Sequence, residues 1–192
     1  MPYRMPIIFN ATRFVAGVRN RLSNFGRRLR RAQDGTSAIE FALLGVPFIA
    51  LLVAILETGL VFFSQQLLQT ATTAAVRSIM TGQAQTAGTT SAQFKQSVCD
   101  NASSIFNCAN MYVNVQKFST FSGMSQMSPI SNGSFNSAGL SYAMGGPGDI
   151  ILVQTFYKLA VSSGPLGFNI SNIGGGQDLI VGTAVFRNEP YK

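Results

Sequence analysis

Two carboxylates, Glu40 and Glu57, stand alone in an otherwise apolar stretch of the chain. Glu57 is the only ionisable side chain between Phe41 and Phe63, and Glu40 directly precedes this run. A carboxylate among apolar residues is costly without a partner, so ionisable groups in such segments are functional candidates by default. The chemistry that each glutamate offers is an ion pair with a cation. The alternative for Glu40 is that its side chain reaches the lipid headgroup interface and is solvated there.

Glu57 lies 17 residues beyond Glu40. At ~100° per residue it is roughly a quarter turn away from the helix face that carries Glu40. Because it lies near the far end of the apolar run, both simple solvation and a contact with a partner are open to it. We therefore treat Glu40 and Glu57 as candidate functional residues.

Cys99 and Cys108 are the only cysteines, and the sequence has no histidine. Both cysteines follow the apolar run, which we expect to span a membrane, so they lie in the part of the chain outside the cytoplasm. That compartment is oxidising and favours a disulfide between them, which would close a short loop. Two thiols without histidine are a poor basis for zinc, so we predict a disulfide and no metal site.

Catalytic chemistry finds little support in the sequence. The absence of histidine excludes the usual Ser-His-Asp and Cys-His arrangements. The four acids that follow the apolar run are dispersed, with no spacing that implies a carboxylate pair; they are Asp100, Asp149, Asp178 and Glu189. The glycines at 174–176 lack the lysine of a phosphate loop and indicate a turn. We expect neither enzymatic activity nor a cofactor.

The element that positions Glu40 and Glu57 is a helix of membrane-spanning length. Phe41 to Phe63 is 23 residues, about 34 Å of helix against a hydrocarbon core of about 30 Å. Pro47 favours a kink that a membrane helix tolerates. Beyond the run, helical periodicity continues to about Thr81, with Gly82 as the stop. The predicted apolar stripe of this extension is Leu67, Leu68, Ala71, Ala75 and Ile79, and its wetter side includes Gln65, Gln66, Gln69, Thr70, Thr73 and Arg77.

The first 35 residues are strongly basic. Eight arginines against Asp34 give this segment a formal charge of +7, which equals the net charge of the whole chain. By the positive-inside rule, the N-terminus is cytoplasmic and the part beyond the span is outside the cytoplasm, in the periplasm if the cell has two membranes. The arginine cluster at 27–31 is also typical of nucleic-acid binding, because clustered arginines contact phosphates. We favour a topology determinant with affinity for anionic lipid, because the cluster adjoins the span and no basic surface follows it.

The part after the span reads as one small domain. A short helix is predicted for Ser91 to Val98, and strands for Met111–Phe118, Ile150–Ala160 and Asp178–Arg187. Residues 119–149 and 162–177 are rich in serine and glycine and are predicted to be long surface loops. The predicted class is α+β: a long N-terminal transmembrane helix that continues into a small domain with an antiparallel sheet.

Gly35 and Thr36, followed by Glu40 and Phe41, form a junction that resembles the processing site of type IV prepilins. The arginine-rich stretch, Ala38 to Leu43, Glu57 with Gly59, and the closing residues 183–190 are similar to the TadE-like family of minor pseudopilins from tight-adherence (Flp, type IVb) pilus systems. The resemblance implies cleavage between Gly35 and Thr36. Glu40 is then the fifth residue of the mature chain, and its partner is the new α-amino group of Thr36 on a neighbouring subunit.

The same resemblance implies a role in pilus assembly, with Glu40, Phe41 and Glu57 as the assembly residues, and a set of partners. These are a prepilin peptidase, other pilins and pseudopilins, the inner-membrane pilus assembly platform and the lipid bilayer, with no nucleic acid among them. The expected division is a cleaved leader at 1–35, a transmembrane and spine helix at 36–81, and an extracytoplasmic domain at 82–192. Two alternatives remain open: an uncleaved single-span protein whose outer domain binds an envelope component, and an anchored enzyme.

Overall fold

The computed structural model describes residues 36–102 and 105–191. Its first element is the helix α2 (Thr36–Met80), which includes Pro47 and ends within one residue of the predicted position. Two units are distinguished along the chain, divided between Ile49 and Ala50. The part of α2 from Ala50 onward therefore belongs with the small domain, and the description below concerns that unit.

Gly82 ends α2 as predicted. Its φ of 80° is left-handed, a conformation that suits glycine, and its N–H donates to the carbonyl of Ile79 at 3.1 Å. A Cβ at this position would collide with the ring of Tyr191. The C-terminal residues thus pack on the end of α2, and the N–H of Glu189 donates to the carbonyl of Met80 at 2.9 Å.

Two short helices follow, α3 (Gln83–Thr86) and α4 (Ser91–Asn101). The second confirms the helix predicted from Ser91 and extends three residues further. Thr90 and Gln93 form a capping box that fixes where α4 begins. The helix buries Phe94 and Val98 against the sheet and brings Cys99 to the disulfide.

The predicted disulfide joins Cys99 of α4 to Cys108 of η3 (Cys108–Asn110), with a Cα–Cα distance of 5.8 Å. We expect the double variant Cys99→Ser/Cys108→Ser to lower the free energy of unfolding by about 2 to 3 kcal/mol, since the bond closes a short loop. The midpoint of thermal unfolding should fall by about 5 to 10 °C. Circular dichroism of the full chain in detergent measures it, and adding reductant should affect the wild type only. An equal midpoint in both proteins would contradict the prediction.

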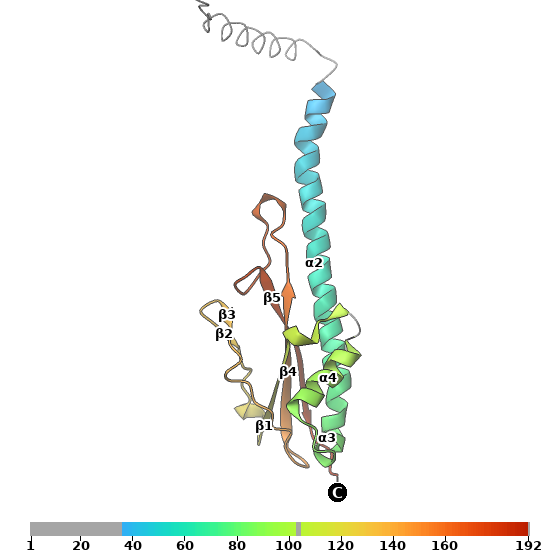
Figure 1. The fold of residues 1–192 in the computed structure, drawn as a ribbon, viewed down its shortest axis with the longest axis vertical. Helices are drawn as coiled ribbons and strands as arrows, with labels where there is room; N and C mark the ends of the chain where they lie inside the picture. The colour runs from blue at the N-terminus through green and yellow to red at the C-terminus, as the bar shows by residue number, and fades with distance from the viewer. Residues whose placement is uncertain (1–35, 103–104, 192) are drawn as a thin grey trace, which may run out of the picture. The chain divides into compact units, whose positions relative to one another are not determined.

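The sheet has three antiparallel strands in the order β1-β4-β5 (Figure 1). Strands β1 (Met111–Phe118) and β4 (Ile150–Ala160) have the predicted bounds, and β5 (Gln177–Arg187) begins one residue earlier. The central strand β4 is buried on both faces over its first eight residues. The predicted α+β fold with an antiparallel sheet is therefore confirmed.

One face of the sheet packs on α2, and the apolar stripe predicted for this helix is the part that it buries. Leu68, Ala71, Ala75 and Ile79 are at most 3% exposed, and Leu67 is half-buried. Every second residue of each strand faces α2 and completes this core, among them Val115, Ile151, Val153 and Ile180. Amphipathic packing of α2 against the sheet is what holds the helix and the domain together as one unit.

The opposite face of the sheet is covered by the segment 119–149, which was expected to be a long surface loop. It holds η4 (Phe121–Gly123) and a small hairpin, β2 (Ile130–Ser131) and β3 (Ser134–Phe135). The ring of Phe135 lies 4.5 Å from that of Tyr112, centre to centre, and 6.2 Å from that of Phe156. Buried Gln154 also exchanges two hydrogen bonds with the backbone of Met127. The segment is thus fastened to the sheet by aromatic and amide contacts.

Candidate functional site

The first feature of the candidate site is the exposed apolar surface of α2. Large apolar side chains face outward along this helix; they are Ile39, Phe41, Leu43, Leu44, Val46, Phe48, Ile49, Leu51, Leu52, Val53, Ile55, Leu56, Leu60, Phe62 and Phe63. Among the described residues, α2 is the one helix long and apolar enough to cross a membrane. The chain therefore has the character of a single-pass membrane protein.

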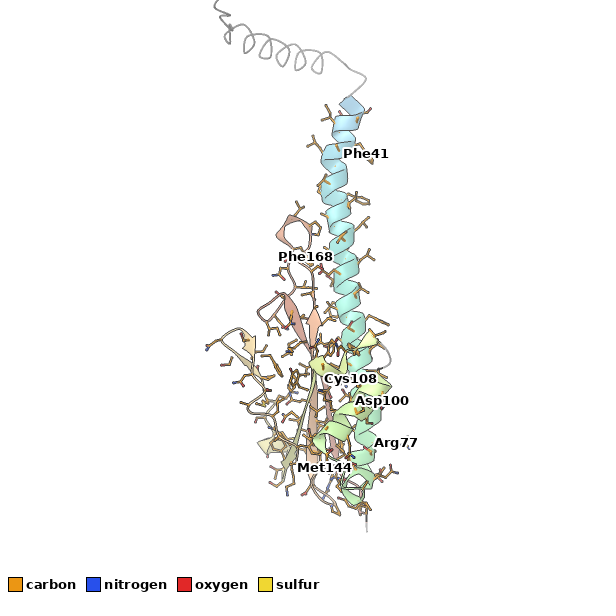
Figure 2. The ribbon with its side chains drawn as sticks, in the orientation of Figure 1. Phe41, Arg77, Asp100, Cys108, Met144 and Phe168 are labelled. Atoms are coloured by element: carbon orange, nitrogen blue, oxygen red, sulfur yellow. A yellow bond between two sulfur atoms is a disulfide. The ribbon has the colours of Figure 1, made fainter. Side chains whose placement is uncertain are left out.

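Glu40 and Phe41 lie in the second turn of α2. Both side chains are exposed, Phe41 by 78% (Figure 2). Within the described part of the chain, the one ion pair joins Lys117 to Asp149, so Glu40 has no cationic partner there. Thr36 begins the helix, whereas Gly35, the other half of the predicted processing junction, lies outside the described residues. Glu40 is placed where a second molecule can reach it.

Glu57 has a different environment. It is half-buried beside the loop that joins β4 to β5, in a groove of about 530 Å³ lined by α2 residues such as Leu56 and Leu60. A Cβ at Gly164 would lie 3.2 Å from Glu57 Oε2, so the loop approaches the carboxylate closely. Glu57 Oε1 is buried and accepts no hydrogen bond from the described residues. Glu57 thus lies in a groove between α2 and a loop of the same chain.

The spine part of α2 is joined to the sheet by two glutamines. Gln65 Nε2 donates to the carbonyl of Val181 at 2.6 Å, and the N–H of Val181 donates back to Gln65 Oε1 at 3.2 Å. Gln69 makes the same pair with Thr183, at 2.8 and 2.9 Å. Residues i and i+4 of a helix are about 6.0 Å apart along its axis, and residues j and j+2 of a strand are about 6.8 Å apart. Two side chains spaced by four on a helix can therefore each reach one of two alternate strand residues. The two side chains occupy the free edge of β5.

The prediction that Gln65 and Gln69 lie on the wetter side of the helix is wrong. Both are half-buried, because the edge of β5 offers unpaired backbone groups that their amides satisfy. A third amide continues the series, since the N–H of Leu179 donates to Asn172 Oδ1 at 2.7 Å. Two glutamines spaced by four on one helix were the available signal. The strand that they bind lies 114 to 116 residues further along the chain, so helical periodicity alone does not indicate it.

Gly182 permits this close approach of strand and helix. It lies between Val181 and Thr183 of β5, and a side chain at this position would point toward α2. A Cβ there would lie 3.0 Å from the carbonyl oxygen of Leu68 and still closer to Thr72 Oγ1. Any larger residue must push the helix away from the strand.

The acids outside α2 have separate structural settings. Asp149 accepts a hydrogen bond from the N–H of Gly146 at 2.7 Å, which lowers the pKa of its carboxyl, and it lies 3.6 Å from Lys117 Nζ. Burial raises the pKa of Asp178, and Asp100 accepts from Gln96 at 2.8 Å. Within the described residues no three histidine, cysteine or acidic side chains gather in a way that suits a metal ion. The structure thus brings none of these acids together.

Part of the chain matches a known protein family. Residues 35–77 match the family described as TadE-like protein. The matched segment contains Glu40, Glu57 and both glutamines that bind β5, and it confirms the resemblance drawn from the sequence. The curated proteins and the solved structures give no match.

Proposed function

We propose that this chain, TadE-like over residues 35–77 and thereby implicated in the tight-adherence pilus system, is a minor pseudopilin that supports pilus assembly. The observation that carries the proposal is the family match, which begins at Gly35 and takes in the exposed apolar helix with Glu40. In this proposal a prepilin peptidase cuts between Gly35 and Thr36. The leader at 1–35 is removed, and residues 36–81 remain as the span and spine of the domain at 82–192.

Cleavage creates a cation for Glu40, which has no cationic partner among the described residues. The new α-amino group belongs to Thr36, and residues at i and i+4 share one face of a helix. A face that carries an amine and, one turn later, a carboxylate can bind a second copy or a related pilin head to tail, with the amine of one on the carboxylate of the next. Such heterologous contacts need not close, and they propagate as a filament. In a low-dielectric surrounding the pair fixes the axial offset between neighbouring helices.

The proposed topology follows from charge. The leader carries the +7 formal charge of the chain, so it stays in the cytoplasm, and the disulfide-bonded domain lies outside, in a periplasm where one exists. The proposed partners are the prepilin peptidase, other pilins and pseudopilins, the inner-membrane assembly platform and the bilayer. The role is structural, and the proposal includes no catalytic step of its own.

Processing gives the direct test. In cells with an active prepilin peptidase, mass spectrometry of the membrane-extracted protein should find the mature N-terminus at Thr36. We expect Gly35→Leu to leave the full-length chain, because a bulky residue then occupies the junction. The matched control Gly26→Leu, in the same leader, should be processed normally.

Surface pili provide the second readout of that experiment. Deletion of the protein should remove or reduce them, and the wild type and Gly26→Leu should restore them. Recovery of only full-length chain from wild-type cells with normal pili would reject processing. It would favour the alternative of an uncleaved single-span protein whose outer domain binds an envelope component.

A further inference from the structure

The loop that joins β4 to β5 lies beside the apolar part of α2. It contains the single turn η5 (Pro165–Gly167), followed by Phe168 (Figure 2). Gly164 approaches Glu57, and Pro165 lines the same groove as Val53 and Leu56. Figure 1 shows this loop alongside the helix, on the side of the domain away from α3. The loop therefore reaches a level of α2 at which the helix surface is apolar and exposed.

The composition of the loop differs from that of an ordinary solvent loop. From Leu159 to Gln177 the chain has no charged residue. Its tip exposes Leu166 by 78%, equal to the most exposed large apolar side chain of α2, and Pro165 is exposed as well. Contiguous exposed apolar surface marks a site that binds an apolar phase or a partner, and this tip adds to the exposed apolar surface of α2 beside it.

The backbone also presents this leucine outward. Leu166 has φ 60° and ψ 23°, a left-handed conformation that glycine and asparagine adopt far more readily than leucine. A bulky apolar residue at a position that favours glycine points to a role for the side chain itself, since local strain persists where function requires it.

The depth of the loop follows from counting along the helix. Glu57 is 21 residues after Thr36, a rise of about 32 Å, close to the thickness of a hydrocarbon core. Counted from Phe41, where the apolar run begins, the rise to Glu57 is about 24 Å. On either count Glu57 lies near the outer border of the span, so the loop beside it lies close to the headgroup region. Side chains that enter a membrane from its surface reach about 5 to 10 Å, which suits a single exposed leucine.

We propose that the tip at 162–168 is a second membrane contact, with Leu166 inserted into the outer leaflet of the bilayer that α2 spans. The contact continues the apolar surface of α2 and places Glu57 in a headgroup environment between helix and loop. It holds the domain against the membrane surface. The proposal rests on α2 being a membrane span but not on cleavage or on pilus assembly.

The test uses the full chain reconstituted in phosphatidylethanolamine and phosphatidylglycerol vesicles, with one added cysteine that carries an environment-sensitive fluorophore. Cys99 and Cys108 are bonded to each other and do not react. The label is placed at Ser163 near the tip, at Leu51 in the span, or at Ser122 in the comparable turn η4. Nitroxide lipids should quench the labels at 163 and 51 but not at 122, and aqueous iodide should quench the label at 122 alone.

Leu166→Asn in the Ser163→Cys background is the decisive variant. Asparagine accepts the left-handed conformation, so the turn is kept while the apolar side chain is lost. The label at 163 should then lose its quenching by nitroxide lipid and become open to iodide. Quenching by nitroxide lipid at position 51 but not at position 163 overturns the proposal. Protection at 163 from both quenchers also overturns it, because a protein surface then covers the tip. Absence of lipid quenching at both positions overturns the span together with the tip.

Discussion

We expect Glu40→Ala to weaken the association of the chain with other pilins strongly, while its insertion into the membrane persists. Removing one partner of a desolvated ion pair leaves an unpaired buried charge and costs about 3 to 5 kcal/mol. Association should therefore weaken on the order of 100-fold or more. Insertion does not suffer, because alanine makes the span more apolar. Co-purification with pilin partners and counts of surface pili measure association, and carbonate extraction measures insertion.

Two variants serve as controls for this result. Glu40→Gln keeps the size of the side chain and removes its charge, so it should behave as Glu40→Ala does if the ion pair is what matters. Glu57→Ala removes the other carboxylate of the apolar run and should associate better than either Glu40 variant. The N-terminus of each variant is checked by mass spectrometry, since a processing defect also prevents assembly. Normal pili from correctly processed Glu40→Ala would mean that the carboxylate is only an interfacial group.

Local patterns predicted the elements of this fold closely. The alternation of Met111 to Phe118 and of Ile150 to Ala160 gave strand bounds that agree with β1 and β4 at both ends. Gly82 predicts the end of α2 because helices commonly end at a glycine, and in the structure it has the left-handed conformation that this role requires. These features depend on residues within a few positions of one another, which is why a single sequence reveals them.

Contacts between distant segments were not predicted. Gln65 and Gln69 look like solvent residues on a helical wheel, and their role depends on the free edge of β5 more than 110 residues away. The strands β2 and β3 have two residues each, too few for alternation to be recognised. The approach of Gly164 to Glu57 depends in the same way on where a hairpin tip falls along the helix.

The candidate site was predicted from chemistry rather than from geometry. Glu40 and Glu57 stand out in the sequence because charge is rare in apolar runs, and the structure gives them different surroundings. One is exposed in the second turn of α2, and the other lies half-buried under a loop. Periodicity placed them about a quarter turn apart on the helix. It contained no information on the loop, so it did not distinguish their environments.

Gly182→Val separates the spine of α2 from the sheet and should lower the stability of the domain strongly. Valine has a higher strand propensity than glycine, so propensity alone predicts that this substitution stabilises β5. A loss of stability would therefore have to come from packing. The valine Cβ would meet the carbonyl oxygen of Leu68 at 3.0 Å, and the overpacking costs about 1 to 3 kcal/mol. Displacing α2 also weakens the hydrogen bonds of Gln65 and Gln69 to β5, at about 0.5 to 1.5 kcal/mol for each bond. The midpoint of thermal unfolding should fall by about 10 °C or more.

The matched control is Gly174→Val, which adds the same side chain just before β5. A Cβ at Gly174 has no neighbour closer than 3.5 Å, so this variant should unfold within a few degrees of the wild type. A second control uses the smaller variant Gly182→Ala, whose Cβ would meet the hydroxyl of Thr72. Adding Thr72→Ala removes this hydroxyl and should recover part of the stability lost in Gly182→Ala. Such a coupling is expected only if the two residues touch. Equal unfolding midpoints for Gly182→Val and Gly174→Val would show that β5 does not need this close approach to α2. The glutamine contacts would then be incidental to the attachment of the domain to its helix.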